Sequence, residues 1–314
     1  MKEPLVILTG PTAVGKTKLS LALAKAIGGE IISADSMQVY RHMDIGSAKI
    51  RPEEMQGVPH YLVDVLEPFE EFHVVRFQQM AKAAIKEIRS HGHIPILVGG
   101  TGFYIQAIVK DIDFTENEAS PYRQELSALA AEKGSAYLHQ RLQQVDPASA
   151  KIIHANNVKR VIRALEFYQM TGEPISKHNE EQREKSSPYQ FAYFVLQDDR
   201  ARLYARIEQR VDEMLEEGLL EEVKALQAMG LKRGMVSMQG LGYKELLACL
   251  DGECTLEEAV EQIKKDTRHF AKRQITWFKR EQDVIWIDKA AYAYQEERML
   301  ASMLKILREK EIIR

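Results

Sequence analysis

The stretch that decides the fold is Gly10-Pro11-Thr12-Ala13-Val14-Gly15-Lys16-Thr17, a G-x-x-x-x-G-K-[ST] loop. It directly follows the apolar run 5–8 and directly precedes a helical pattern over 16–27. The two glycines let the backbone curl so that successive N–H groups point inward, Lys16 adds a charge, and Thr17 offers a hydroxyl to Mg²⁺. The sequence therefore predicts a polyphosphate site at the start of a helix, whether the phosphates belong to a nucleotide or to another ligand.

The first hundred residues alternate short apolar runs with amphipathic segments. This alternation is typical of a mainly parallel sheet that helices cover on both faces. Together with the phosphate loop, it predicts an α/β fold with a P-loop NTPase-like parallel sheet. The segment 46–57 is expected to form a mobile loop near the site. The expected strands are 5–9, 30–33, 61–65 and 94–98, and the expected helices are 16–27 and 74–89.

The strand patterns stop in the middle of the chain, where the sequence becomes helical with charged faces. We therefore expect an inserted all-helical domain at 114–189, between the two parts of the α/β core at 1–113 and 190–314. Thr255 and Glu258 have the spacing of a capping box at the start of a long helix. The remaining expected elements are strands at 190–197 and 284–287 and long helices at 199–216 and 256–280.

The composition of the 314 residues is that of a globular protein, with 45% hydrophobic and 28% charged residues. No apolar run approaches the roughly 20 residues that a membrane helix needs, and the first residues lack a signal-peptide pattern. We expect a cytoplasmic protein that does not contact a membrane. Cys249 and Cys254 are too few for a disulfide framework or a four-ligand zinc site.

Two candidate catalytic residues follow expected strands, and strand ends of a parallel sheet meet at one edge. Asp35 follows 30–33 and is a carboxylate for Mg²⁺, a general base, or the cap of a turn. The strand 94–98 ends in Gly99-Gly100-Thr101-Gly102 instead of the carboxylate that a Walker B strand carries. The Thr101 hydroxyl is placed to donate to a phosphate or leaving-group oxygen, with a plain strand-to-helix turn as the alternative.

Basic side chains form three stripes on expected helices, although the net charge of the chain is −3. Each stripe alone is typical of a solvated helix face, because Lys and Arg are common on surfaces. Together the three stripes indicate a folded polyanion as partner. They consist of Arg202, Arg206 and Arg210; of Lys159, Arg160 and Arg163; and of Lys264, Lys265, Arg268 and Lys272.

Taken together, these motifs resemble the bacterial form of the tRNA dimethylallyltransferase (isopentenyltransferase) family. The resemblance runs in family order along nearly the whole chain, and the zinc-finger extension of eukaryotic members is absent. The matching segments are the phosphate loop, 32–36 (ISADS), 38–40 (QVY), 43–49 (MDIGSAK), 99–102 (GGTG) with Tyr104, 157–166 (NVKRVIRALE), 206–212 (RIEQRVD), 240–243 (GLGY) and 273–278 (RQITWF).

The resemblance implies transfer of a dimethylallyl group from dimethylallyl diphosphate to N6 of the adenosine on the 3′ side of the tRNA anticodon, position 37. It implies Asp35, Thr101 and Lys16 as catalytic residues and Mg²⁺ as the cofactor, with Thr17 as its ligand. The implied partners are the tRNA anticodon stem-loop and the diphosphate, and we expect a monomer. The implied diphosphate-binding residues are Gly10, Pro11, Thr12, Ala13, Val14, Gly15, Lys16, Thr17, Arg206 and Arg210.

The same resemblance implies a set of tRNA contacts. Arg123 is assigned by its spacing after Gly99-Gly100-Thr101, and Lys244 stands where an arginine is expected. The implied tRNA-binding residues are Asp35, Ser36, Met37, Gln38, Thr101, Arg123, Lys159, Arg160, Arg163, Gln239, Gly242, Tyr243, Lys244, Arg273 and Gln274.

Two other functions fit parts of the sequence. A small-molecule kinase of the nucleoside-monophosphate type shares the phosphate loop and the sheet, and its loop would bind ATP. The Gly99-Gly100-Thr101 strand end speaks against it. An RNA-binding module without chemistry would leave Asp35 without a role.

Overall fold

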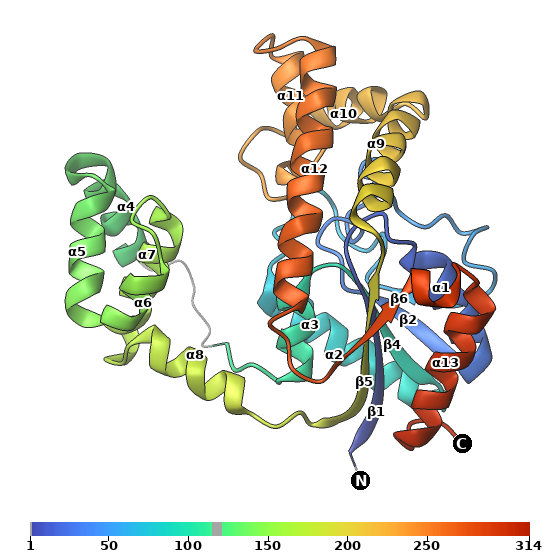
Figure 1. Ribbon diagram of the computed structural model, residues 1–314. Coiled ribbons are helices and arrows are strands. Elements are labelled where there is room, and N and C mark those ends of the chain that lie inside the picture. Colours follow the sequence, from blue (N-terminus) through green and yellow to red (C-terminus); the bar gives the residue numbers. More distant parts are fainter. Residues whose placement is uncertain (1, 115–120) are drawn as a thin grey trace. The chain divides into compact units, whose positions relative to one another are not determined.

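The computed structural model describes residues 2–114 and 121–314 (Figure 1). The chain divides into two compact units, one formed by Met1–Val109 with Pro188–Arg314 and the other by Lys110–Ser187. Residues 115–120, which the sequence analysis assigns to the start of the inserted domain, lie outside the described residues.

The first unit is built on a six-stranded, fully parallel sheet with the order β3-β2-β4-β1-β5-β6. Along β1, Leu5 and Ile7 belong to one buried core, and Val6 and Leu8 belong to a second core on the other face. Both faces are therefore covered, which confirms the predicted α/β fold. The strands are β1 Glu3–Thr9, β2 Gly29–Ser33, β3 His60–Tyr61, β4 Ile94–Gly99, β5 Tyr189–Gln197 and β6 Val284–Asp288.

Helices supply the apolar side chains of both cores. Phe77 and Tyr104 stack at 4.4 Å in the first core, and Leu19 and Met303 lie in the second. The helices of this unit are α1 Lys16–Ile27, α2 Val74–Ser90, α3 Gly102–Val109, α9 Arg200–Glu216, α10 Leu219–Ala228, α11 Tyr243–Leu250, α12 Leu256–Phe278 and α13 Glu296–Glu309, with 3₁₀ turns η1 Ser237–Gln239 and η2 Lys289–Tyr292.

The predicted capping box at the start of α12 is confirmed. The Glu258 amide donates to the Thr255 hydroxyl at 3.2 Å, and the Thr255 amide donates to the Glu258 carboxylate at 2.8 Å. Each side chain thus satisfies a backbone donor that the helix itself leaves unpaired.

The strand predicted at 61–65 is wrong beyond its first residue, because β3 ends at Tyr61. Leu62 and Asp64 have φ angles of 61° and 62°, in the left-handed region that a strand cannot contain. The apolar residues of this stretch misled the prediction, since Leu62 is buried in the core without being part of a strand.

The second unit contains only helices among its described residues, 110–114 and 121–187. Asp146 ties two of them together, because its carboxylate accepts hydrogen bonds from the amides of Ser149 (2.9 Å) and Ser176 (2.9 Å). The helices are α4 Pro121–Lys133, α5 Ser135–Val145, α6 Pro147–Ile152, α7 Val158–Thr171 and α8 Ile175–Glu184. No helix in the described part of the chain has the length and apolar character needed to cross a bilayer.

The carboxyl ends of β2 and β4 are pressed together at the edge that carries the phosphate loop. The Ala34 amide donates to the Val98 carbonyl at 2.7 Å, and the Thr101 amide donates to the Ala34 carbonyl at 3.3 Å. A Cβ atom on Gly99 would lie 2.2 Å from the Ala34 oxygen, so only glycine fits there. The Gly-Gly-Thr-Gly segment is thus needed for this close approach.

We expect Gly99→Ala to lower the free energy of unfolding of the first unit by about 3 kcal/mol, because backbone atoms must move apart to admit the methyl group. Gly57→Ala is the control, since Gly57 has a φ of 80° and nothing within 4 Å of its added Cβ. It should cost only about 1 kcal/mol from backbone strain. Urea unfolding followed by the fluorescence of Trp277 and Trp286 measures both. Equal losses would contradict the close-approach argument.

Candidate active site

The phosphate loop wraps around the ammonium group of Lys16. Its Nζ donates to the carbonyl oxygens of Gly10 (3.1 Å) and Pro11 (2.9 Å), and α1 begins at Lys16 itself. Thr17 is exposed in the first turn of that helix. The amides of the helix N-terminus and a positive charge therefore meet at one place, as an anion site requires.

Gln274 braces the loop from α12. The Thr12 amide donates to Gln274 Oε1 at 2.9 Å, and Gln274 Nε2 donates to the Gly100 carbonyl at 3.0 Å. The side chain is only 6% exposed. Gln274 was predicted to contact tRNA, whereas in the structure it joins the two glycine-containing loops to each other.

A second pair of cations holds the other side of the loop. The Val14 carbonyl accepts from Lys289 Nζ at 3.0 Å and from Arg206 Nη1 at 3.4 Å. The carboxylate of Asp198, only 1% exposed, lies 3.4 Å from Lys289 and 3.7 Å from Arg206. Neither Lys289 nor Asp198 was predicted from the sequence. Asp198 directly follows the expected strand 190–197, and Lys289 is the second residue after 284–287. These positions were the available signal, because the two strands end at the same edge.

The charges of Asp35 and Arg210 act on the phosphate loop. Burial lowers the pKa of Lys16 to about 8, with Asp35 acting to raise it and Arg210 to lower it further. Burial likewise lowers the pKa of Arg210, against the opposing effect of Asp35. The structure thus brings Lys16, Asp35, Arg206 and Arg210 together. Arg202 lies 4.0 Å above the ring of Tyr294, which also lies 5.9 Å from Lys289 Nζ, so it stands beside the cations that brace the loop.

The two oxygens of the Asp35 carboxylate have different surroundings. Its Oδ1 accepts from the amides of Met37 (2.8 Å) and Gln38 (3.4 Å), which is the turn-capping arrangement that the sequence leaves open. Within residues 2–114 and 121–314, no hydrogen bond engages Oδ2. Asp35 is also partly exposed. One oxygen therefore fixes the side chain while the other remains available to a substrate.

A cleft of about 850 Å³ opens beside the phosphate loop and is lined by Thr17, Arg206 and Arg210. Residues 44, 45 and 48–54 also line it, so part of the segment 46–57 lies near the phosphate loop, as predicted. Arg206, Arg210 and the Thr17 hydroxyl make the part of the cleft beside the phosphate loop suitable for an anionic ligand, whereas acidic residues outnumber basic ones in the lining as a whole.

Glu222 on α10 anchors residues 44–46. Its carboxylate accepts the amides of Asp44 (2.8 Å), Ile45 (2.8 Å) and Gly46 (3.1 Å), and also the hydroxyl of Tyr243 (2.7 Å). The anchor went unnoticed in the sequence, where nothing links residue 222 to the segment that begins at 44.

The turns that hold the predicted base contacts lie against each other. A Cβ on Gly240 would lie 2.7 Å from Met37 Sδ, and Gln38 Nε2 donates to the Ala48 carbonyl at 3.3 Å. Tyr243 is fully buried, so its ring has no exposed surface for a base to stack on. The side chains of this region that remain partly or fully exposed are Ser36, Met37, Gln38, Gln239, Lys244, Thr101 and Arg273.

In the second unit, the predicted tRNA residues fall into two groups. Arg123 Nη2 and Arg163 Nη1 lie 2.6 Å and 3.7 Å from the fully buried carboxylate of Glu166. Lys159 and Arg160 are exposed. The first pair stabilises the interior of this unit, and the second pair faces solvent.

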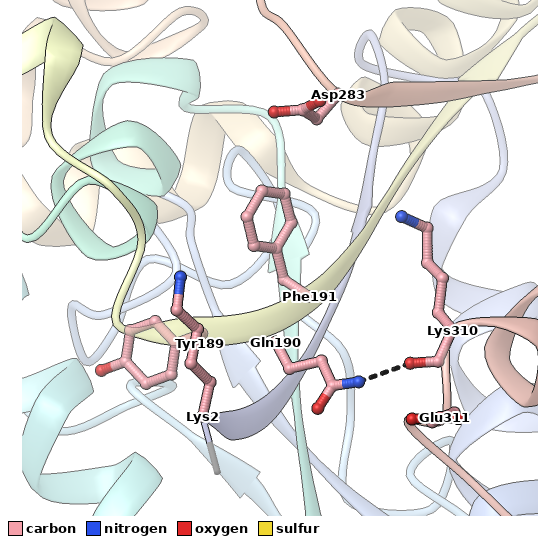
Figure 2. A pocket seen from close by; sticks show the side chains of 7 residues that line it. All are labelled: Lys2, Tyr189, Gln190, Phe191, Asp283, Lys310 and Glu311. Carbon is pink, nitrogen blue, oxygen red and sulfur yellow. Dashed lines mark hydrogen bonds between the residues drawn. The ribbon is translucent and has the colours of Figure 1, made fainter.

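A further pocket of about 420 Å³ lies at the amino ends of β1 and β5, away from the phosphate loop (Figure 2). Its main internal contact is a hydrogen bond from Gln190 Nε2 to the Lys310 carbonyl at 2.6 Å. None of the predicted site residues lines it. The lining residues are Lys2, Tyr189, Gln190, Phe191, Asp283, Lys310 and Glu311.

The chain is similar to known proteins along nearly its whole length. The family model described as IPP transferase matches residues 38–281. The tRNA dimethylallyltransferase of Lachnoclostridium phytofermentans is 66% identical over 313 residues, which are 99% of this chain and 100% of the relative. The structure of the tRNA isopentenylpyrophosphate transferase of Bacillus halodurans is 45% identical with a TM-score of 0.74, covering 99% of this chain and 98% of that one.

A solved eukaryotic dimethylallyltransferase, described as acting on tRNA, is 31% identical with a TM-score of 0.79. The match covers 91% of this chain and 74% of that one.

We expect the affinity for pyrophosphate to fall about tenfold between pH 7 and pH 9, because the free Lys16 loses its proton near pH 8 and a bound anion favours the protonated form. Isothermal titration calorimetry measures this affinity. Lys16→Arg is the control, since arginine stays charged and any change that remains reports the ionisation of pyrophosphate itself. The same pH dependence in both proteins would contradict the lowered pKa of Lys16.

Proposed function

The chain belongs to the IPP transferase family, and on that basis we propose that it transfers a dimethylallyl group from dimethylallyl diphosphate to N6 of adenosine 37 in tRNA, releasing diphosphate. The observation that carries this proposal is the position of Asp35. Its carboxylate stands at the sheet edge that holds the phosphate loop and acts on the charge of Lys16. An acid and a diphosphate cradle side by side are what this transfer needs.

The phosphate loop would hold the diphosphate as a leaving group. As the bond between C1 of the dimethylallyl group and the diphosphate oxygen breaks, both electrons stay on that oxygen. Loop amides, Lys16, Arg206 and Arg210 are placed to stabilise this charge, and the Thr101 hydroxyl is the candidate donor from the neighbouring loop. The loop carbonyls that Lys16 now holds would then give way to phosphate oxygens.

Mg²⁺ fits the same place. The exposed Thr17 hydroxyl lines the cleft, and Mg²⁺ commonly takes one or two protein oxygens together with substrate phosphates. When bound, the ion would supply further positive charge to the departing diphosphate. We assign Thr17 as its protein ligand.

Asp35 would act as the general base. The adenine amino group is a weak nucleophile because its lone pair is delocalised into the ring, so removal of an N6 proton assists attack on C1. Oδ2 is the oxygen that accepts this proton, since Oδ1 holds the turn amides of Met37 and Gln38. The new N6–C1 bond thus forms as the C1–O bond breaks.

The tRNA must present its adenine outside the base stack. Extruding a base costs a few kcal/mol, which backbone contacts elsewhere on the tRNA offset. Lys159 and Arg160 on the second unit and Arg273 on the first are exposed cations suited to phosphate contacts. Lys244 is partly buried and pairs with Glu245 (3.2 Å) and Asp266 (3.7 Å). Arg123 and Arg163 would act mainly through Glu166, by holding the fold of the inserted unit.

All groups assigned to the chemistry come from one chain, so we propose a monomer as the active form, working in the cytoplasm. The alternative, a small-molecule kinase, lacks support at β4, which ends in glycine and threonine instead of a metal-binding carboxylate. Incubation with dimethylallyl diphosphate and unmodified tRNA, followed by nucleoside mass analysis, separates the two. Prenylated adenosine supports the transferase, and ATP consumption without it supports the kinase.

Asp35→Asn should lower the turnover of tRNA prenylation about 10²- to 10⁴-fold, because an amide still caps the turn but cannot take a proton. The affinity for tRNA should change less than threefold. Asp212→Asn is the matched control, an exposed carboxylate on α9 that pairs with Lys264. Turnover of Asp35→Asn within tenfold of the parent would remove the general-base role.

Arg160→Ala should weaken tRNA binding and reduce the slope of log affinity against log salt by about one, because one phosphate contact is lost. The exposed Lys305, on α13, provides the control substitution Lys305→Ala. Filter binding at several salt concentrations measures both slopes. If the Arg160→Ala slope matches that of the parent, Arg160 lies outside the tRNA interface.

A further inference from the structure

Three side chains converge at the amino edge of the sheet, where the proposed transfer has no use for them. Glu30 is a β2 residue and is only 3% exposed. His91 and His93 flank Gly92 in the turn that joins α2 to β4. Their Nδ1 atoms lie 3.1 Å and 2.5 Å from the same oxygen, Glu30 Oε1. Asp35 follows the carboxyl end of β2, so this cluster lies at the opposite edge.

The other oxygen of Glu30 is fixed separately. Tyr61, in β3, donates its hydroxyl to Oε2 at 2.8 Å. This leaves Oε1 directed at the two imidazoles. Carboxylates that bind metals are commonly oriented by such a hydrogen bond to the oxygen or ring atom that does not ligate.

We propose that Glu30, His91 and His93 form a binding site for one divalent transition-metal ion, with Zn²⁺ as the ion that fits best. The three ligand atoms lie within 4.8 Å of one another. Tetrahedral Zn²⁺ with bonds of about 2.0–2.1 Å separates its ligand atoms by about 3.3 Å. The observed separations from Oε1 need an outward movement of less than about 1 Å, and the half-exposed ring of His93 has room for it.

The chemistry of the donor set selects the class of ion. Two imidazole nitrogens with one carboxylate oxygen suit zinc and its first-row neighbours, whereas Mg²⁺ and Ca²⁺ prefer all-oxygen sites. Because both rings are about half exposed, water has access to the fourth position. Metal binding here would therefore be separate from the Mg²⁺ proposed at Thr17.

The charge of Glu30 supports this assignment. Burial acts to raise its pKa, but hydrogen bonds from His93, Tyr61 and His91 outweigh burial, so the pKa lies below its usual value. The carboxylate is thus ionised at neutral pH, as a ligand must be. An incoming ion would displace the imidazole protons that now face Oε1, so binding should release protons.

A bound ion would have a structural effect. It would add a link between Glu30 in β2 and the α2–β4 turn, whose two histidines follow Glu30 by 61 and 63 residues. Anything that binds only the folded state raises its stability. The ion would therefore stabilise the first unit without taking part in the transfer.

The test is calorimetric titration of the chelator-treated protein with ZnCl₂ alone at pH 7.5. The protein carries Cys249→Ser and Cys254→Ser, because thiols also bind zinc. We expect one ion per chain, about 100-fold weaker binding in His91→Gln or His93→Gln, and about tenfold weaker binding in Tyr61→Phe. His269→Gln is the matched control, since this exposed histidine lies outside the cluster, and it should bind as the parent does.

Two results would overturn the proposal. One is the absence of saturable binding up to about 100 µM zinc in the parent, well above the affinities of protein zinc sites. The other is binding that both histidine variants retain in full. The exposed histidines keep the test decisive even if Glu30→Gln does not fold, and Co²⁺ added in place of zinc gives a visible spectrum that reports nitrogen ligands directly.

Discussion

Three loops meet at the carboxyl edge of the sheet with no space for an additional atom, and the site depends on this packing. A Cβ on Gly10 would lie 2.7 Å from the Leu196 oxygen, one on Gly99 would lie 2.2 Å from the Ala34 oxygen, and one on Gly100 would lie 2.2 Å from Gln274 Nε2. Such contacts hold the phosphate loop, the turn that starts at residue 35 and the strand end at residue 99 at fixed positions relative to one another. This packing keeps the backbone amides of the phosphate loop in place for the negative charge that develops on a leaving group.

Around this packed edge, some polar and charged side chains hold the phosphate loop in place, and others are left to bind the ligand. Gln274, Lys289 and Asp198 hold the backbone of the phosphate loop from α12 and from the ends of β6 and β5. Lys16 and Arg210 remain for the ligand, and burial lowers the pKa of both. Burial strengthens electrostatic interactions, so an anion placed here meets cations that bulk water no longer screens fully.

The sequence predicted what is local and failed where distant segments meet. The helix α1 and the capping box of α12 each rest on residues a few positions apart, and both were predicted correctly. The strand at 61–65 failed because left-handed residues at 62 and 64 are not visible in an apolar pattern. The hydrogen bond between Gln274 and Thr12 joins residues 262 positions apart, and the one between Glu222 and Asp44 joins residues 178 positions apart. No rule based on local spacing predicts such contacts. Asp198 could have been predicted as a site residue, because it follows an expected strand, and Asp35 was predicted on that ground.

The central claim is that Asp35 and the phosphate loop act on one substrate pair. A crystal structure with pyrophosphate, Mg²⁺ and an anticodon stem-loop tests it most directly. The account predicts phosphate oxygens within about 3 Å of the loop amides and of Lys16, and the Asp35 carboxylate within hydrogen-bond distance of N6 of an extruded adenine. Diphosphate bound outside the loop, or an adenine whose N6 faces away from Asp35, would contradict it.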